Sequence, residues 1–549
     1  MSGLTRRDLL HAMLGAPFAA TACKSKKRVP DGELAFKPED LGHLVRDAHG
    51  AGGKGPPEIP ADKWERARVV VIGGGIAGLS AARRLLAAGI DDIVLLELES
   101  APGGTARSGA GSTSAYPWGA HYITAPMKEH QDLVALLGEM GLVEGTDAAG
   151  EPTFIEQALC REPQERLFAN GTWHDGLYLH DGETEDEKRQ WERFRTTIER
   201  FAGLRDAKGR RAFAVPTARS SDDAELTALD KMSMAEWLDR ERLTSPRLRW
   251  LVDYACRDDF GAHATHTSAW AGVHYYASRI VAPGKDPQAV LTWPAGNGFL
   301  VDKLHAKARA KVRCGLAALD VAPVVRDGKA GVDVIAIGKA PLAVGIHAER
   351  VIFAAPQMVA RVAVRPYREA PPAHLSAFEY GAWMVANITL SGRPANRTRA
   401  PRPILAWDNV LYESPSLGYV VATHQSMRDH GPTVLTYYLP LCDEDPRAAR
   451  KKLYAAGRDE WADVALADLE KAHPDIRDLA TRVDVVRWGH AMVRPSPGFV
   501  WGTARKAAAE PLRGIHFAHT ELSGVSLFEE AFFQGNRAAD EVIAALRGA

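Results

Sequence analysis

The distribution of hydrophobic residues changes sharply near Arg66. Before it, residues 24–65 are basic and then rich in glycine and proline, a composition typical of a tether. After it, the continuous apolar run Val69–Ile72 predicts a strand buried on both faces. Glycines, an alanine- and leucine-rich helix to about Ala88 and a second apolar strand at Ile93–Leu96 follow. The pattern predicts a βαβ unit with which the folded body begins.

The middle of the chain shows the periodicity of amphipathic helices. It is clearest between about 181 and 259, where hydrophobic side chains recur at three- and four-residue steps around Phe194. Ser233 and Glu236 are spaced so that each side chain can cap a backbone donor of the other, which predicts the start of a further helix. We expect this region to form a mainly helical segment on the substrate side.

Strand patterns return in the second half of the chain. A helix is expected after residue 298, then strands at Val332–Ile337, Ala343–Ile346 and Arg350–Phe353, and a final helix over 530–546. The expected parts are an export signal (1–23), a flexible linker (24–65), a dinucleotide-binding domain in three pieces (66–180, 296–379 and 487–549), a helical segment (181–295) and a β-rich substrate domain (380–486).

Charge and cysteine content exclude several classes of function. The 549 residues include 68 basic and 69 acidic ones, so no overall field favours nucleic acid. The five cysteines lie far apart and lack the paired spacing of zinc, iron–sulfur or dithiol sites. We therefore expect neither a nucleic-acid partner nor a metal site.

The first 23 residues resemble a bacterial twin-arginine export signal. Arg6 and Arg7 precede Asp8–Leu10 and a weakly apolar stretch that ends at Ala22. This stretch is too short and too interrupted to span a bilayer as a mature helix. The resemblance implies passage through the twin-arginine export machinery and a periplasmic location. The alternative is an unstructured basic N-terminus.

The signal is compatible with two kinds of cleavage site. Ala20–Cys23 resembles a lipoprotein box, in which a lipidated Cys23 would anchor the protein to the outer face of the inner membrane. An ordinary signal-peptidase site near the same place would release a periplasmic protein instead.

A glycine-rich turn joins the first predicted strand to the first helix. Gly73, Gly75 and Gly78 form the pattern G-x-G-x-x-G. The first glycine permits a sharp turn, the second lets a pyrophosphate approach the backbone, and the third allows close packing of the helix. The amides of Ile76 and Ala77 would then face the phosphates from the helix N-terminus.

An acidic residue at the end of the second strand supports this interpretation. Glu97 stands nineteen positions after Gly78, where its carboxylate can accept hydrogen bonds from a ribose diol. The two features predict a dinucleotide site. They leave NAD and FAD open, because both cofactors contain an ADP half.

A second glycine motif favours FAD. Gly103 and Gly104 precede Thr105–Ser108 and resemble the second signature of the FAD-dependent amine oxidase, protoporphyrinogen oxidase and phytoene desaturase superfamily. The resemblance implies an α/β fold, namely a two-dinucleotide-binding-domain flavoprotein with a Rossmann-like FAD domain and an α+β substrate domain. In that family the doublet passes close to the pyrophosphate and ribityl chain of the flavin. Arg107, which lies slightly beyond the doublet, would pair with a phosphate.

Further segments extend the resemblance over most of the chain after residue 66. Trp118–Tyr122 resembles the strand edge that faces the isoalloxazine, which implies Gly119 and Ala120 as cofactor contacts. Residues 349–356 resemble the family's return strand beside the adenine, with a main-chain contact near Ala318.

The end of the chain is similar to the family's C-terminal FAD motif. Gly514–Glu521 and Ser526–Ala531 match its strand, loop and helix, and the helix N-terminus would point its amides at the flavin pyrimidine. The resemblance implies Thr520, Glu521 and Phe528 as cofactor contacts, although the family has a glutamate at the position of Thr520 and usually a glycine at that of Glu530. No cysteine follows Cys442, so non-covalent FAD is favoured.

Candidate catalytic residues are the aromatic and histidine side chains expected over the flavin, because positioning of the substrate carries most of the catalysis in this family. Trp488 and His490 precede the C-terminal motif, and Tyr419 and His424 come from the expected substrate domain. Each has a simpler alternative role as a core aromatic or a hydrogen-bonded histidine.

Together these features imply an FAD-dependent oxidoreductase that takes hydride from a small molecule and passes the electrons to oxygen or a membrane quinone. A C–H bond next to nitrogen is the favoured point of attack. One alternative is a desaturase or isomerase that acts on a polyene or porphyrinogen. Another, from a different class, is a non-catalytic binding protein of related fold.

Overall fold

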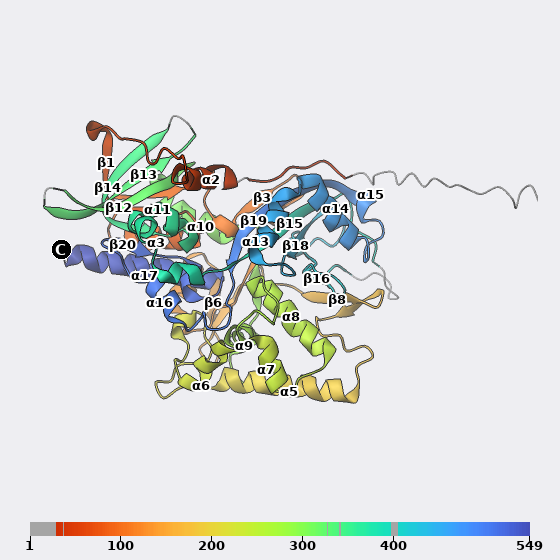
Figure 1. Ribbon diagram of the computed structural model, residues 1–549. Coiled ribbons are helices and arrows are strands. Elements are labelled where there is room, and N and C mark those ends of the chain that lie inside the picture. Colours follow the sequence, from red (N-terminus) through yellow and green to blue (C-terminus); the bar gives the residue numbers. More distant parts are fainter. Residues whose placement is uncertain (1–28, 37, 327, 340–341, 397–403, 549) are drawn as a thin grey trace, which may run out of the picture.

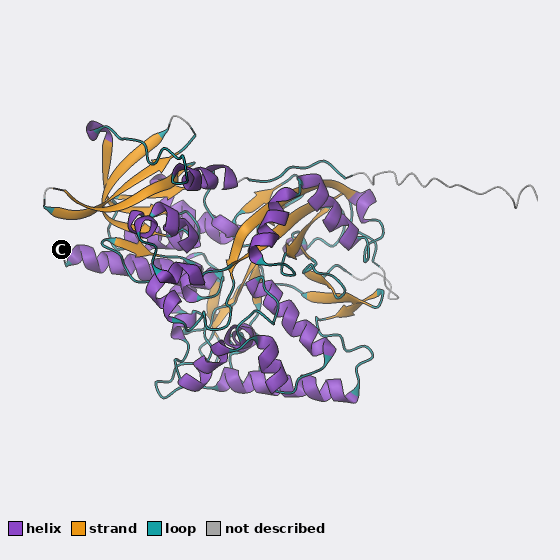
Figure 2. Ribbon diagram, in the orientation of Figure 1, coloured by secondary structure: helices purple, strands orange, loops and turns teal. Residues whose placement is uncertain are grey.

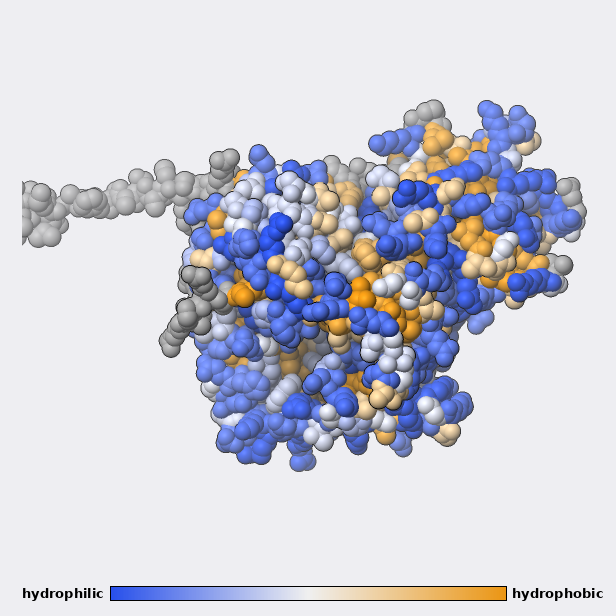
Figure 3. All heavy atoms as spheres, turned by 180° about the vertical axis from the view of Figure 1, so that it is seen from behind, coloured by the Kyte–Doolittle hydropathy of each residue, from blue (hydrophilic) through white to orange (hydrophobic). Residues whose placement is uncertain are grey.

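The computed structural model describes residues 29–36, 38–326, 328–339, 342–396 and 404–548 (Figure 1). The expected export signal and Cys23 lie outside the described residues. None of the helices in the described ranges has the length and apolarity needed to cross a membrane. Seen from behind in Figure 3, hydrophilic side chains cover most of the surface and hydrophobic ones gather in separate patches.

A seven-stranded sheet at the upper left of Figure 1 forms the core of the nucleotide-binding domain. Its order is β11 (Val312–Cys314), β2 (Ile93–Glu97), β1 (Trp64–Ile72), β14 (Ala343–Phe353), β13 (Lys329–Ile337) and β12 (Ala317–Arg326), and β20 (Ile515–Phe517) also pairs with β14. The βαβ unit is confirmed, since α3 (Ile76–Ala87) connects the parallel strands β1 and β2.

One expectation about this sheet is wrong. The two strands predicted at 343–346 and 350–353 are the single strand β14. The polar residues between them remain extended because β14 is paired on both sides: His347 lies opposite Arg66 of β1 and opposite Asp333 of β13. The hydrophobic pattern of the sequence is interrupted at His347, but the backbone hydrogen bonds to the neighbouring strands continue through it.

A second seven-stranded sheet, on the right in Figure 1, has helices along its outer side (Figure 2). Its order is β19 (Ala480–Val493), β15 (Tyr380–Leu390), β18 (Thr433–Pro440), β17 (Tyr419–Val421), β16 (Asp408–Leu411), β8 (Glu165–Ala169) and β9 (Thr172–Asp175). The helices are α13 (Pro446–Ala455), α14 (Arg458–Leu469) and α15 (Ile476–Leu479). The sheet therefore combines residues 380–493 with two strands from much earlier in the chain.

The helical segment forms the lower part of the molecule in Figures 1 and 2. It contains α5 (Glu185–Gly203), α6 (Ala224–Thr227), α7 (Met234–Arg240), α8 (Pro246–Phe260) and α9 (Ala269–Ala277). The capping box is confirmed: the Ser233 side chain accepts from the Glu236 amide, and the Glu236 side chain accepts from the Ser233 amide.

The remaining elements connect these three parts. They are α2 (Pro38–Ala48), β3 (Ser108–Ala110), β4 (Ala115–Pro117), β5 (Tyr122–Thr124), α4 (Gln131–Glu139), β6 (Val143–Thr146), β7 (Pro152–Phe154), β10 (Val290–Thr292), α10 (Gly298–Ala308), α11 (Gln357–Ala363), α12 (Arg365–Glu369), α16 (Thr503–Ala508) and α17 (Phe528–Arg547). The helices expected after residue 298 and at the end of the chain are confirmed as α10 and α17. Residues 29–36 and α2, in the range expected as a tether, pack against β19 and β12 respectively.

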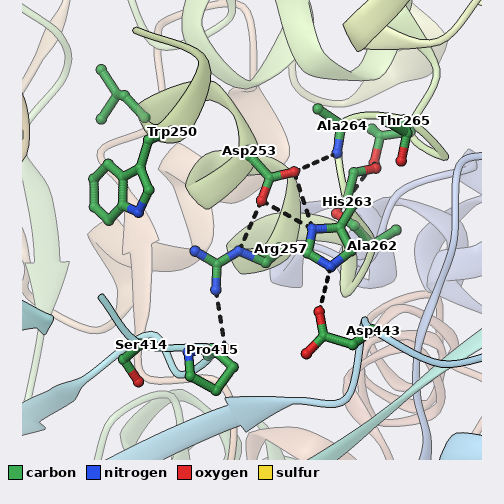
Figure 4. A network of polar contacts seen from close by, with 12 residues as sticks. Trp250, Asp253, Arg257, Ala262, His263, Ala264, Thr265, Ser414, Pro415 and Asp443 are labelled. Carbon is green, nitrogen blue, oxygen red and sulfur yellow. Dashed lines mark hydrogen bonds and ion pairs between the residues drawn. The ribbon is translucent and has the colours of Figure 1, made fainter. Parts of the chain in front are cut away.

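A histidine joins the helical segment to the second sheet (Figure 4). His263 Nδ1 lies 3.0 Å from Asp253 Oδ2, and His263 Nε2 lies 2.9 Å from Asp443 Oδ1. Arg257 pairs with Asp253 at 3.2 Å and donates a hydrogen bond to the Pro415 carbonyl at 3.0 Å. These contacts hold α8 against the loops of the second sheet.

This junction makes stability depend on pH. The hydrogen bond to Asp253 is the main cause that raises the pKa of His263, and Asp443 adds to it, while burial and, to a smaller extent, Arg257 oppose it. A raised pKa in the folded state means that the imidazolium stabilises the fold fully below its ordinary pKa of about 6.5, and that this contribution is lost as pH rises through the folded-state value. We expect His263→Gln to cost about 1 kcal/mol at a pH near 5.5 and less at a pH near 9, as measured by thermal unfolding.

The matched control is the exposed neighbour His266. Its replacement by glutamine should leave the thermal midpoint unchanged at both pH values. Equal losses of stability in His263→Gln at both pH values would contradict a charged histidine at this junction.

Candidate active site

The turn between β1 and α3 depends on two glycines for its shape and leaves a third open. Gly73 has φ +103°, a conformation that side-chain-bearing residues rarely adopt. A Cβ at Gly78 would lie 1.8 Å from the Gly73 carbonyl oxygen, so α3 can approach the turn only without a side chain there. Gly75 has φ −70°, and a Cβ at this position would meet no protein atom within 4 Å. The space in front of Gly75 is therefore open.

Helix α3 begins directly behind this open space. No side chain caps its N-terminus, and Ile76 and Ala77 of its first turn are buried. First-turn amides lack an acceptor within the helix, and the helix dipole is positive at this end. This combination suits a pyrophosphate bound in front of Gly75.

The Glu97 carboxylate is fixed at the end of β2. The Gly74 amide donates to Oε2 at 2.7 Å, and the Glu99 amide donates to Oε1 at 2.8 Å. Burial is the largest influence on the pKa of Glu97 and raises it. A carboxylate held in this way still has free acceptor directions for the hydroxyls of a ribose.

The second glycine motif packs beside the first. Gly103 has φ +128°, Gly104 has φ +56°, and the Gly103 amide donates to the Gly74 carbonyl at 2.8 Å. A Cβ at Gly104 would lie 3.5 Å from the Gly75 Cα. The two motifs therefore border the same open space.

Arg107 approaches the doublet from its other side. Its Nε donates to the Gly104 carbonyl at 3.3 Å, and its guanidinium lies 3.8 Å from Glu99 Oε2. The side chain is buried, and this burial lowers its pKa, although the guanidinium remains charged at physiological pH. The side chain thus supplies a desolvated positive charge beside the glycine motifs.

The strand edge expected to face the isoalloxazine contacts the doublet segment. The Ala120 amide donates to the Thr105 carbonyl at 3.0 Å, and a Cβ at Gly119 would lie 2.4 Å from that carbonyl oxygen. Helix α17 approaches α3 equally closely, since a Cβ at Gly535 would lie 2.2 Å from the Ala77 carbonyl oxygen. Backbone meets backbone at both places.

Four other predicted contacts have defined positions. Thr520 donates to the carbonyls of Val525 and Leu527 at 2.9 and 3.1 Å, which shapes the loop before α17. Glu521 is fully buried and accepts from the Gln357 amide and the Tyr380 hydroxyl, which ties the motif to α11 and β15. Burial raises the pKa of Glu521 to about 7. The remaining two are Ala318, which lies buried in β12, and Phe528, which begins α17.

An aromatic group lies beyond the flavin-side strand edge. The His121 ring centroid is 5.4 Å from that of Trp407 and 4.8 Å from that of Tyr438. The Tyr438 hydroxyl donates to the Gly119 carbonyl at 2.8 Å. Burial lowers the pKa of His121 to about 4, so its ring is neutral at physiological pH. Side chains of the second sheet domain thus reach the strand edge at Gly119.

A group of acidic side chains adjoins these rings. Arg279 donates to the Tyr122 hydroxyl at 3.3 Å and pairs with Asp259 at 3.0 Å. Burial and the neighbouring Asp259 raise the pKa of Asp258, and burial and Asp258 raise the pKa of Asp408. We call Asp258, Asp259 and Asp408 the acidic group. Arg279 is the positively charged side chain that offsets these carboxylates in part.

Part of the acidic group lies at an interior pocket, which Asp259 lines. Three side chains beside it are only partly buried, namely Asp258, Asp408 and Tyr122. Loss of contact with water is nevertheless the main cause that raises their pKa values. The pocket, bounded by Asp259, Arg279 and Glu529, opens next to them. These residues come from α8, from the chain just after α9, and from α17, so the pocket lies between the helical segment and the nucleotide-binding domain.

Glu529 adds a second buried carboxyl group to the wall of this pocket, besides Asp259. It accepts a hydrogen bond from the Thr124 amide at 3.2 Å, and burial raises its pKa to about 7. The pocket wall therefore contains two carboxyl groups, those of Asp259 and Glu529, whose charge is poorly solvated.

The four predicted catalytic residues lie in different surroundings. Trp488 donates to the Trp118 carbonyl at 2.7 Å and so adjoins the flavin-side strand edge. The His490 ring lies 5.5 Å from the Tyr380 ring, and burial lowers the pKa of His490 to about 4.

Tyr419 and His424 have partners inside the second sheet domain. The Tyr419 hydroxyl lies 2.7 Å from His473 Nε2, and the His424 Nε2 lies 2.9 Å from the Arg161 carbonyl. The structure does not bring these two into the aromatic group around His121, and the contacts it shows for them are structural.

The acidic residues of α8 are a feature that the sequence analysis missed. Asp259 continues a stripe of buried residues, Leu251 and Ala255, at four-residue spacing on α8. A carboxylate on the buried stripe of an amphipathic helix was the signal available, because such a charge needs a partner or a ligand.

The fold and the site together define a dinucleotide-binding oxidoreductase fold whose glycine motifs fit FAD. The sequence profile of the flavin-containing amine oxidoreductases matches residues 76–543, and the chain belongs to this family. It is an FAD-dependent oxidoreductase, and the fixed carboxylate and the open helix terminus described above are suited to hold its cofactor. No curated protein sequence is similar enough to count as a relative.

Solved structures share the fold. Wild-type putrescine oxidase bound to putrescine aligns with a TM-score of 0.59 and 15% identity, over 87% of this chain and 99% of its own. Cyclohexylamine oxidase from Brevibacterium oxydans IH-35A gives 0.61 and 16%, over 88% and 99%. A protein from Exiguobacterium sp. 255-15, provisionally assigned as a protoporphyrinogen oxidase, gives 0.57 and 16%, over 88% and 99%.

Gly75 offers a test of the cofactor site that spares the fold. Its backbone conformation accepts any residue and its Cβ position is open. The Gly75→Val variant should therefore fold, with a thermal midpoint close to that of the wild-type protein without FAD. The valine side chain would occupy the space of the pyrophosphate, and we expect the purified variant to lose its yellow FAD absorbance.

Gly78→Val is the contrasting variant, because a side chain there collides with the Gly73 carbonyl and should destabilise the apoprotein as well. A Gly75→Val protein that retains FAD stoichiometrically would refute the assigned phosphate turn.

Proposed function

We propose that this enzyme oxidises an amine at the carbon next to nitrogen. The observation that carries the proposal is the acidic group of Asp258, Asp259 and Asp408. It lies beside Tyr122, at the end of the strand edge expected to face the flavin. An ammonium group is the ligand that such carboxylates favour, since it restores the interactions that they lose on leaving water. The structural neighbours putrescine oxidase and cyclohexylamine oxidase carry amine substrates in their names and support this choice.

The same group disfavours the alternative substrates. A polyene carries no charge and would add nothing to the counter-charge that Arg279 supplies only in part. A porphyrinogen carries carboxylate side chains, which Asp258 and Asp408 would repel. A non-catalytic binding protein would need neither an open space at Gly75 nor an acidic group beside the strand edge.

The residues have distinct parts in the proposed reaction. FAD, when bound, accepts a hydride from the substrate carbon. The acidic group attracts the substrate as its ammonium ion, and a carboxylate takes up one proton, because the nitrogen needs its lone pair to form the C=N bond as the hydride leaves. Trp407 and Tyr438 restrict the position of the carbon, and the closed packing around them excludes water. We propose oxygen as the acceptor that regenerates the oxidised cofactor, with a membrane quinone as the alternative.

We also propose that the protein is exported. The support is the twin-arginine pattern at Arg6 and Arg7 in the sequence. Anchoring through a lipidated Cys23 is the second part of this proposal, and periplasmic release is its alternative.

Anaerobic mixing of the yellow protein with candidate substrates tests the substrate class. We expect primary or secondary amines to bleach the flavin absorbance and uncharged polyenes of similar size to leave it unchanged. Bleaching by polyenes or porphyrinogens alone would replace the amine proposal with the desaturase alternative. A folded protein that binds FAD and is bleached by neither class would favour a binding role.

Removing one carboxylate of the acidic group should separate stability from activity. Asp258→Asn relieves the repulsion from Asp259, so its thermal midpoint should stay equal or rise. For an amine substrate we expect kcat/KM to fall at least about tenfold, which corresponds to roughly 1.4 kcal/mol of lost interaction. The exposed Asp302 on α10 supplies the control Asp302→Asn, which should change neither quantity. An unchanged kcat/KM in Asp258→Asn would remove the support for an ammonium site.

A further inference from the structure

Residues 29–36 form an additional edge on the second sheet, and we call them the strap. Backbone amides of Val483 and Val485 donate to the carbonyls of Asp31 and Glu33, each at 2.9 Å, and the Ala35 amide donates to the Val485 carbonyl at 2.8 Å. The strap thus follows β19 in a regular, parallel arrangement.

The strap fits β19 because of one glycine. A Cβ at Gly32 would lie 1.9 Å from the Val483 carbonyl oxygen. The Glu33 amide also donates to Asp484 Oδ1 at 2.9 Å, and Arg458 donates to the Pro30 carbonyl. The strap is therefore held by main-chain and side-chain contacts along its whole length.

The last residue of the strap covers a charged group of the cofactor site. The Phe36 ring centroid lies 3.9 Å from the Arg107 Cζ. The ring also contacts Trp118 at 5.4 Å, edge to face, and Trp488 at 5.8 Å between centroids. Trp118 directly precedes Gly119, and the Trp488 indole donates to the Trp118 carbonyl. Phe36 therefore contacts the doublet segment, the flavin-side strand edge and β19 together.

We infer that the strap is a latch on the FAD site and that Phe36 is a positioning residue for the cofactor. The ring shields the Arg107 guanidinium from water on one face, while Glu99 and the Gly104 carbonyl hold it on another. A desolvated cation interacts more strongly with a phosphate than a hydrated one, and salt screens it less. The same contact fixes Trp118 and so the edge that ends at Gly119. This inference rests on the FAD site and is independent of the amine substrate.

The test measures release of FAD from the purified holoenzyme after dilution, by the rise of free flavin fluorescence. We expect Phe36→Ala to release FAD at least about tenfold faster than wild type, and the release to accelerate with added salt. The thermal midpoint of the apoprotein should be unchanged. Phe36→Tyr should restore slow, salt-insensitive release, since it retains the ring.

Three further variants keep the test decisive. Phe36→Leu retains apolar volume without a ring over the guanidinium, and should fold and still release FAD faster than wild type. Gly32→Val should displace the whole strap from β19 and give the same fast release. The control Leu44→Ala removes a side chain of α2 that is 47% exposed and should behave as wild type.

The inference is overturned if Phe36→Ala and Phe36→Leu retain FAD as wild type does. It is also overturned if Phe36→Ala lowers the midpoints of apoprotein and holoenzyme equally, because the strap would then stabilise the sheet alone. A wild-type protein that never binds FAD would instead contradict the cofactor site itself, and an enzyme that binds FAD but oxidises no amine would contradict the proposed function alone.

Discussion

Close approach of one backbone to another is the constraint on which the cofactor site depends. At Gly78, Gly119 and Gly535 an added Cβ would lie within 2.4 Å of a carbonyl oxygen, so three separate segments can meet only where side chains are absent. These contacts bring α3, the doublet segment and α17 around one space. Gly75 differs from them because its Cβ position is open. The packing glycines thus create the space that Gly75 leaves free for a ligand.

The substrate side follows a different physical rule, because it is built from buried charges. Asp258, Asp259 and Asp408 come from α8 and β16, which belong to separate parts of the molecule, and Arg279 offsets them only in part. An arrangement of this kind lowers stability unless a ligand completes it. The His263 junction, with Asp253 on α8 and Asp443 beyond β18, holds α8 in place against the repulsion within the acidic group.

The sequence predicts the cofactor half of the molecule far better than the substrate half. The βαβ unit and α17 follow from local spacing, and each is confirmed because the interactions that form it are close in sequence. The Ser233 cap, in the helical segment, is confirmed for the same reason. The acidic group joins α8 to Asp408 about 150 residues later, which no local pattern records. Strand β14 was divided in the prediction because its pairing partners, and not its hydropathy, keep it extended.

A departure from the family pattern shows how the two halves are coupled. Glu530 stands where the resemblance leads one to expect glycine, yet it is fully buried and accepts a hydrogen bond from the Thr217 amide at 2.6 Å. Burial raises the pKa of Glu530 to about 7, so the contact with Thr217 lies in a dry environment. Thr217 belongs to the helical segment, whereas Glu530 lies in the first turn of α17 beside the cofactor site. The side chain that replaces the expected glycine therefore connects the segment that carries Asp258 and Asp259 to the helix that the resemblance places beside the flavin. Because this hydrogen bond fixes the first turn of α17 against the helical segment, the acidic group keeps a constant position relative to α17, as the positioning of a substrate carbon beside a bound flavin would require.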